Sequence, residues 1–174
     1  MSPLILWRRL TPDERYLAVK AYWDDPETKR PVDEALLAQY RKARPVFYEK
    51  MGLGQKLREL AKAGLEKKAP FSPALFLRSW HFGERRDLLI AFLDGCGFTH
   101  EQGALPEEAP VLSAAAYEKG LAALRGRGFS DRDIAVYFST LLTQDELSAE
   151  NRWALLKPFT DAFWAAAENN PPEN

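Results

Sequence analysis

The sequence has one cysteine, two histidines, few β-branched aliphatic residues and no long apolar run. A single cysteine, Cys96, excludes an internal disulfide framework and suits a reducing compartment, so we expect a cytoplasmic protein. No apolar stretch approaches the roughly 18 residues that a membrane span needs. Near the start, the apolar residues 4–7 precede Arg8 and Arg9, which is the reverse of the order in a secretory signal. We therefore expect no membrane partner.

The scarcity of Val and Ile, eight residues together, contrasts with 48 Leu and Ala residues. Strong helix formers thus far outnumber natural strand formers, which predicts an all-α protein. Hydrophobic residues at 46% and charged residues at 28% are typical of a globular chain with its own core. From its length we expect a compact bundle of about 7–9 helices.

Capping residues, prolines and glycines divide this helical chain into segments. The usual signals of a helix start are Ser, Ser-Pro or Thr-Pro, and those of a helix end are Gly or Pro. They predict helices over residues 3–9, 12–24, 31–43, 53–63, 73–80, 84–94, 113–125, 130–142 and 148–167. A break is expected before Pro45 and a long connection over 97–111, and Pro158 should kink or split the last helix.

An internal repeat emerges when the sequence is shifted by 70 residues. Seven of the 24 residues over 2–25 are then identical to those over 72–95, including Ser2-Pro3 with Ser72-Pro73. This similarity suggests a pseudo-duplication of a three-to-four-helix unit. We expect one domain over 1–168, made of pseudo-repeats 2–71 and 72–146 and a C-terminal helix 148–167, with a frayed tail over 169–174.

Charge is unevenly distributed although the net charge is only −1. Residues 1–70 carry 15 Lys/Arg against 10 Asp/Glu, and residues 71–174 carry 9 against 15. The basic excess is concentrated in segment 41–68, and its candidate contact residues are Arg41, Lys42, Arg44, Lys50, Lys56, Arg58 and Lys62. Such a cluster suits phosphates, but it equally suits a solvated helix face or a surface that meets the acidic half.

Two further sets of residues are candidates for recognition. Arginines recur at equivalent places in the two pseudo-repeats (Arg8 and Arg15, Arg78 and Arg85), where they would grip an anionic ligand or form ion pairs with nearby carboxylates. Aromatic residues at helical spacing along 153–167 indicate a buried stripe, and its outer member Trp164 is a candidate anchor for a partner or a second subunit.

The 97–111 connection holds the only local set of residues that resembles a catalytic site. Cys96, His100 and Glu101 are close in sequence, and a cysteine nucleophile needs a nearby base. The alternative is a small buried cysteine at a helix end with a surface histidine. One cysteine and two histidines do not make a structural zinc site, so we expect no metal or other cofactor.

These observations favour a non-enzymatic helical module that binds another protein, as a regulatory or assembly subunit. Abundant aromatic residues, the charge asymmetry and the lack of a convergent polar motif carry this interpretation. The partner would be a different protein or a second copy of the chain. Nucleic-acid association through segment 41–68 is the first alternative, and a small-ligand binder or enzyme around loop 96–101 is the second.

Overall fold

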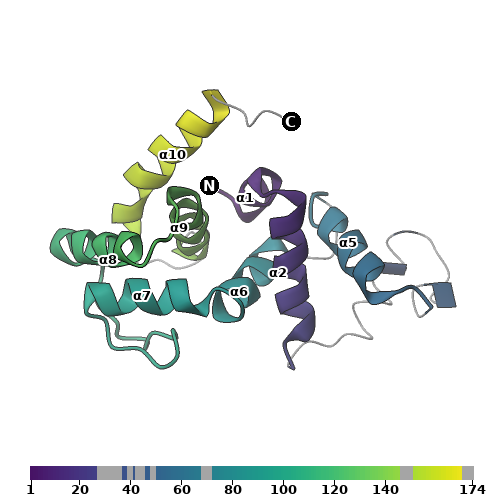
Figure 1. Ribbon diagram of the computed structural model, residues 1–174, viewed down its shortest axis with the longest axis horizontal. Coiled ribbons are helices and arrows are strands. Elements are labelled where there is room, and N and C mark those ends of the chain that lie inside the picture. The colour runs from purple at the N-terminus through teal and green to yellow at the C-terminus, as the bar shows by residue number, and fades with distance from the viewer. Residues whose placement is uncertain are drawn as a thin grey trace. The chain divides into compact units, whose positions relative to one another are not determined.

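The computed structural model describes residues 1–26, 37–38, 41, 46–47, 50–67, 72–145 and 151–169. Within these ranges it contains eight α-helices, one short 3-10 helix and no strand, apart from an isolated bridge between Glu101 and Ala104 (Figure 1). The all-α class predicted from the Leu- and Ala-rich composition is confirmed. No helix in these ranges is long and apolar enough to cross a membrane.

The chain divides into two compact units, which we call the N-terminal unit (Ser2–Gly83) and the C-terminal unit (Glu84–Asn174, with Met1). The N-terminal unit contains α1 (Pro3–Arg9), α2 (Pro12–Asp24), α5 (Leu53–Ala63) and α6 (Pro73–Phe82). The C-terminal unit contains α7 (Arg86–Cys96), α8 (Ala114–Gly126), α9 (Asp131–Asp145), the 3-10 helix η1 (Ala154–Leu156) and α10 (Lys157–Asn169). The boundary falls inside the proposed second repeat, because α6 packs against α1 and α2. The duplication and the single domain over 1–168 stay hypotheses.

Trp7 forms the centre of the N-terminal unit. Its side chain is fully buried, and the indole Nε1 donates a hydrogen bond of 3.1 Å to the carbonyl of Ala61 at the end of α5. The ring lies 5.4 Å from that of Phe76 on α6, and Tyr22 of α2 meets the same ring edge-on at 5.0 Å. One aromatic cluster therefore holds α1, α2, α5 and α6 together.

The starts of α1, α2 and α8 follow the predicted caps. At the start of α2, Thr11 Oγ1 accepts from the backbone N–H of Glu14, and the Glu14 carboxylate accepts from the backbone N–H of Thr11. This reciprocal capping box satisfies two N–H groups that have no partner within the helix. The hydroxyl groups of Ser2 and Ser113 cap α1 and α8 by accepting from the backbone N–H groups of Ile5 and Ala116.

In the C-terminal unit, α9 begins at a capping pair that also carries an ion pair. Asp133 accepts from the hydroxyl and backbone N–H of Ser130, and it pairs with Arg85, which directly precedes α7. Burial raises the pKa of Asp133, but the hydrogen bonds from Ser130 and the charge of Arg85 outweigh burial and bring the pKa below its ordinary value of 3.8. The cluster thus ties the start of α7 to the start of α9.

Glycine permits a close approach of α7 and α8, which run side by side in Figure 1. A Cβ atom at Gly95 would lie 2.7 Å from the Cβ of Ala123, and one at Gly120 would lie 2.5 Å from the Sγ of Cys96. The core of this unit then continues through Phe92, whose ring lies 4.9 Å from that of Phe138 on α9. Close backbone approach is a packing reason for glycine inside a helix.

Several predicted helix ends were wrong by a few residues. The sequence placed the second helix of the second repeat at 84–94 with Gly95 as its stop, whereas α7 spans Arg86–Cys96. Gly97, with φ of +77°, is the left-handed residue that ends the helix. In the same way α6 extends beyond residue 80 to Phe82, and α9 extends beyond residue 142 to Asp145.

The last helix begins later than predicted. Asn151 has a positive φ of 46°, η1 follows at Ala154–Leu156, and α10 starts at Lys157. Pro158 lies in the first turn of α10, where a missing N–H costs no intrahelical bond, so it marks the start of a helix and does not kink one. Four of the predictions lie outside the described residues: most of the helix over 31–43, the break before Pro45, the helix start at Ser148 and the tail over 170–174.

Candidate functional site

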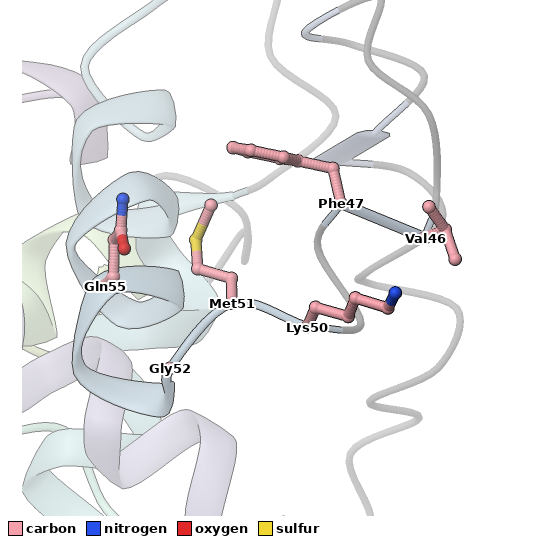
Figure 2. Close-up of a pocket in the computed structure, with 6 residues that line it drawn as sticks. All are labelled: Val46, Phe47, Lys50, Met51, Gly52 and Gln55. Carbon is pink, nitrogen blue, oxygen red and sulfur yellow. The ribbon is translucent and has the colours of Figure 1, made fainter.

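A groove lies at the start of α5, on the described part of the N-terminal unit. It has a volume of about 560 Å³, and we call it the α5 groove. Its lining residues precede α5 or lie in its first turn: Val46, Phe47, Lys50, Met51, Gly52 and Gln55. In Figure 2 the Phe47 ring extends toward α5, and Met51 lies between it and Gln55. The volume lies within the range of about 300–1,000 Å³ that is typical of ligand pockets.

The walls of the α5 groove are apolar and open to solvent. Val46 is 50% exposed and Phe47 is 57% exposed. Leu53, the first residue of α5, is 51% exposed and extends this apolar surface beyond the groove. Isolated exposed apolar residues are common on protein surfaces, but a cluster of large ones beside a hollow marks an interaction site.

A lysine and the positive end of a helix dipole lie beside this apolar surface. Among the six described lining residues, Lys50 is the only charged one. Gly52 forms the N-cap of α5, and within the described residues no side chain caps this helix and its first turn holds no acidic residue. The N-terminus of a helix carries about half a positive charge, so this end of the groove favours a negatively charged group.

Much of the predicted basic segment 41–68 is engaged in ion pairs. Arg41 lies 3.1 Å from Glu66 and 3.8 Å from Glu59, and Lys62 lies 3.2 Å from Glu59. Arg58 lies over the ring of Tyr16, with 5.8 Å between its Cζ and the ring centroid. The structure therefore brings part of this segment together as an internal charge network.

Two residues of the same prediction, Lys42 and Arg44, lie outside the described residues. Lys56 occupies α5 at a half-buried position and follows Gln55 of the groove. Among the described basic residues of this prediction, Lys50 alone lines the groove itself.

The four recurring arginines have different partners in the two units. Arg15 donates to the carbonyls of Trp7 and Leu10 at the end of α1, and Arg8 donates to the carbonyl of Leu65. These bonds satisfy carbonyl groups at helix ends, which is a structural role.

The other two arginines have aromatic or acidic partners. Arg78 lies over the ring of Phe82 at 5.8 Å, and Arg85 of the C-terminal unit pairs with Asp133. Equivalent positions in the proposed repeats therefore make unlike contacts. This arrangement gives no support to a paired anion site.

Cys96 and His100 do not face each other as a nucleophile and its base would. Burial raises the pKa of the Cys96 thiol to about 12, and its sulfur packs against Gly120. His100 Nδ1 accepts from the backbone N–H of Gly103 at 3.2 Å, so Nε2 carries the proton and donates to Asp94 at 3.2 Å. Both ring nitrogens thus serve to fix the turn that follows α7.

The third residue of that candidate set also has a structural contact. The backbone of Glu101 exchanges two hydrogen bonds of 2.9 Å with that of Ala104, and Gly103 in this turn has φ of +94°. The side chain of Glu101 is exposed. Across the described residues, no group of three His, Cys, Asp or Glu side chains is arranged to hold a metal ion.

Trp164 is a core residue of the C-terminal unit. It is 4% exposed, and its indole N–H donates a hydrogen bond of 2.9 Å to the hydroxyl of Ser139 on α9. The side of α10 that carries Trp164 and Thr160 faces α9, and both residues are buried. A buried tryptophan does not serve as an exposed anchor for a partner, so the candidate surface moves from α10 to the α5 groove.

Comparison with known proteins adds no functional assignment. No protein-family model, no curated protein and no solved structure is significantly similar to this chain. The fold and the groove define a helical protein with an exposed, positively rimmed apolar surface. Its function must therefore be argued from that surface.

Proposed function

We propose that the chain is a non-enzymatic interaction module that binds another protein through the α5 groove. The observation that carries this proposal is the exposure of Val46 and Phe47 beside Met51 in a hollow of about 560 Å³. Large apolar and aromatic side chains in a concave surface are the usual energetic centre of a protein interface. Each Å² of apolar surface that a partner covers favours association by roughly 25 cal/mol, and the entropic and desolvation costs of binding are subtracted from this gain.

The competing catalytic interpretation finds less support in the same geometry. Cys96 is held as a thiol by burial, and both nitrogens of His100 hold the turn after α7. Nucleophilic catalysis by cysteine needs a thiolate with a base in hydrogen-bond reach. These contacts favour a scaffold role for the loop and leave recognition to the α5 groove.

Quantitative affinity capture from the native host tests the proposal. The full chain is compared with two variants, Phe47→Asp in the groove and Val111→Asp on the C-terminal unit, where Val111 is 60% exposed. We expect at least one host protein to be retained by the wild type and by Val111→Asp and lost with Phe47→Asp. Unchanged circular dichroism and melting temperature must accompany this loss. The same set of proteins on all three chains would refute binding through the groove.

The nucleic-acid alternative depends on segment 41–68 and is the weaker proposal. Glu59 and Glu66 neutralise part of its charge through Arg41 and Lys62. Phosphate contacts make binding steeply dependent on salt. The test is whether the chain retains mixed oligonucleotides at low salt. Loss of this retention at high salt, and also in the double variant Arg58→Glu and Lys62→Glu, would favour this alternative over protein binding.

A further inference from the structure

The chemistry of the α5 groove indicates what kind of partner segment it binds, and this step rests on the proposed function. The lining residues combine apolar side chains with one cation and, among those described, no anion. Val46, Phe47 and Met51 suit large apolar side chains. Lys50 suits a negative charge next to them.

The start of α5 adds a second site for negative charge at the same place. The carbonyl of Gly52 accepts from the N–H groups of Gln55 and Lys56 at 3.0 and 3.1 Å, and no described side chain caps the helix. Gly52 and Gln55 line the groove, so this helix end opens onto it. A carboxylate from a partner would complete a cap that no described side chain of this chain supplies.

The charge of the whole N-terminal unit acts in the same direction. Residues 2–83 carry 16 Lys/Arg against 10 Asp/Glu, a balance of +6. Complementary charge increases the rate of encounter and discriminates between partners more than it increases final affinity. The unit therefore attracts an acidic partner and repels a basic one.

We infer that the α5 groove binds a short acidic segment of another protein, in which large apolar side chains enter the groove and neighbouring Asp or Glu carboxylates meet Lys50 and the start of α5. A nucleic acid fits this surface less well, because among the described lining residues only Phe47 offers a planar face for stacking bases and only Lys50 is basic. A second copy of the chain is also acidic in residues 84–174, with 8 Lys/Arg against 15 Asp/Glu. The test therefore has to separate it from a foreign partner.

Peptide selection on the immobilised full chain tests the inference. A random 12-residue display library is depleted on Phe47→Asp and then selected on the wild type. We expect the recovered peptides to be rich in Asp and Glu and to contain at least one Phe, Leu, Ile or Trp. The strongest peptide is then synthesised with a fluorophore, together with a form in which each acidic residue is replaced by its amide.

Affinity of the synthetic peptide is measured by fluorescence anisotropy for matched charge variants. Lys50→Glu should weaken binding by about tenfold, and Lys119→Glu on α8 of the C-terminal unit should leave it unchanged. The amide form should bind more weakly than the acidic form, and raising salt should reduce this difference by screening.

The outcomes separate this inference from the proposed function. Neutral or basic peptides that still require Phe47 would overturn the acidic specificity and leave the groove as a protein-binding site. If no peptide distinguishes the wild type from Phe47→Asp, the proposed function fails as well. Concentration-dependent dimerisation in light scattering, abolished by Phe47→Asp, would make the occupant a second copy and overturn the inference. If a mixed oligonucleotide displaces the peptide from the wild type and does not bind Lys50→Glu, the inference is overturned in favour of nucleic acid.

Discussion

Replacing Gly120 with alanine should destabilise the C-terminal unit, because α7 and α8 pack too closely to admit a side chain. A Cβ atom at this position would lie 2.5 Å from Cys96 Sγ and 2.7 Å from the nearest ring carbon of Phe92. Heavy atoms in favourable contact are about 3.5–4.0 Å apart, so the two helices or the side chains must separate by roughly 1 Å.

The surroundings of Phe92 limit how far this pair of helices can adjust. Phe92 is fully buried, and its ring lies 4.9 Å from Phe138, 5.7 Å from Tyr137 and 6.1 Å from Trp153. An extra methyl group in a packed core costs about 1–3 kcal/mol. Alanine recovers up to about 1 kcal/mol through its higher helix propensity. We expect the free energy of unfolding to fall by about 1–2 kcal/mol.

Gly126, the last residue of α8, is the matched control. A Cβ atom there would meet nothing within 4 Å, so Gly126→Ala should be neutral or stabilise the chain by up to about 1 kcal/mol. Urea unfolding followed by circular dichroism gives both changes on the same scale. Equal stability of the two alanine variants would refute the close packing of α7 and α8.

A double-mutant cycle identifies the atom that causes the loss. Cys96→Ala removes the sulfur nearest to the new methyl group, so Gly120→Ala should cost less in that background. The clash with Phe92 remains, so the recovery is partial, and the coupling energy should be at least about 0.5 kcal/mol but smaller than the loss of about 1–2 kcal/mol. Strict additivity would mean that the sulfur is not the obstacle.

Three other predictions follow from the C-terminal unit. The pKa of Asp133 is lower in the folded than in the unfolded chain, so its pairing with Arg85 stabilises the fold above pH 3.8, and this stabilisation is lost as pH falls below that value. Asp133→Asn should therefore lower stability at pH 7. In a plot of the urea midpoint against pH, the variant should show a smaller decrease at acidic pH than the wild type. The Cys96 thiol, with its pKa raised to about 12, should resist a thiol reagent at pH 8 until urea unfolds the chain, and rapid native labelling would contradict its burial. Trp164→Phe should lower the free energy of unfolding by about 1–3 kcal/mol, because it removes the indole N–H that donates to the buried Ser139 hydroxyl. In a Ser139→Ala background the same substitution should cause a smaller loss, and urea unfolding measures both.

The starts of α1, α2 and α8 were predictable from the sequence because their signals are local. Ser2, Thr11 and Ser113 cap the helices that follow them, and each cap bonds a backbone N–H three residues along the chain. Such a bond needs only the right residue at the right spacing, with no contribution from the rest of the fold. The all-helical class is predictable for a similar reason, since propensity accumulates along each segment.

Helix ends were harder to predict because two glycines can have different functions at neighbouring positions. Gly95 lies inside α7, where it admits α8, and Gly97 ends the helix in a left-handed conformation. The sequence Gly-Cys-Gly does not reveal which glycine meets another helix, because that contact is made with Ala123, far along the chain. Packing between distant segments determined this boundary.

The α5 groove was missed for the same reason. Lys50 was predicted as one of several basic residues of segment 41–68, but nothing local separates it or Phe47 from core or solvated positions. Exposure depends on which apolar residues find partners in the fold: Leu57 and Leu60 of α5 are buried, whereas Leu53 at its start is half exposed. All three belong to the helical pattern of one short segment, so periodicity alone does not rank them.

The loop after α7 holds the residues that the sequence suggested as a catalytic set, and its contacts argue for a structural role. At the start of the loop, His100 forms hydrogen bonds with Asp94 and Gly103. Toward its end, the N–H of Leu112 donates to the carbonyl of Arg152. The Arg152 side chain in turn donates to the carbonyl of Glu107. These bonds connect the loop to the end of α7 and to the segment before η1. Polar residues that satisfy buried or constrained backbone groups stabilise a fold, and altering them for recognition would expose those groups. A surface for partners is better placed where large side chains are exposed, as those of Val46, Phe47 and Lys50 are.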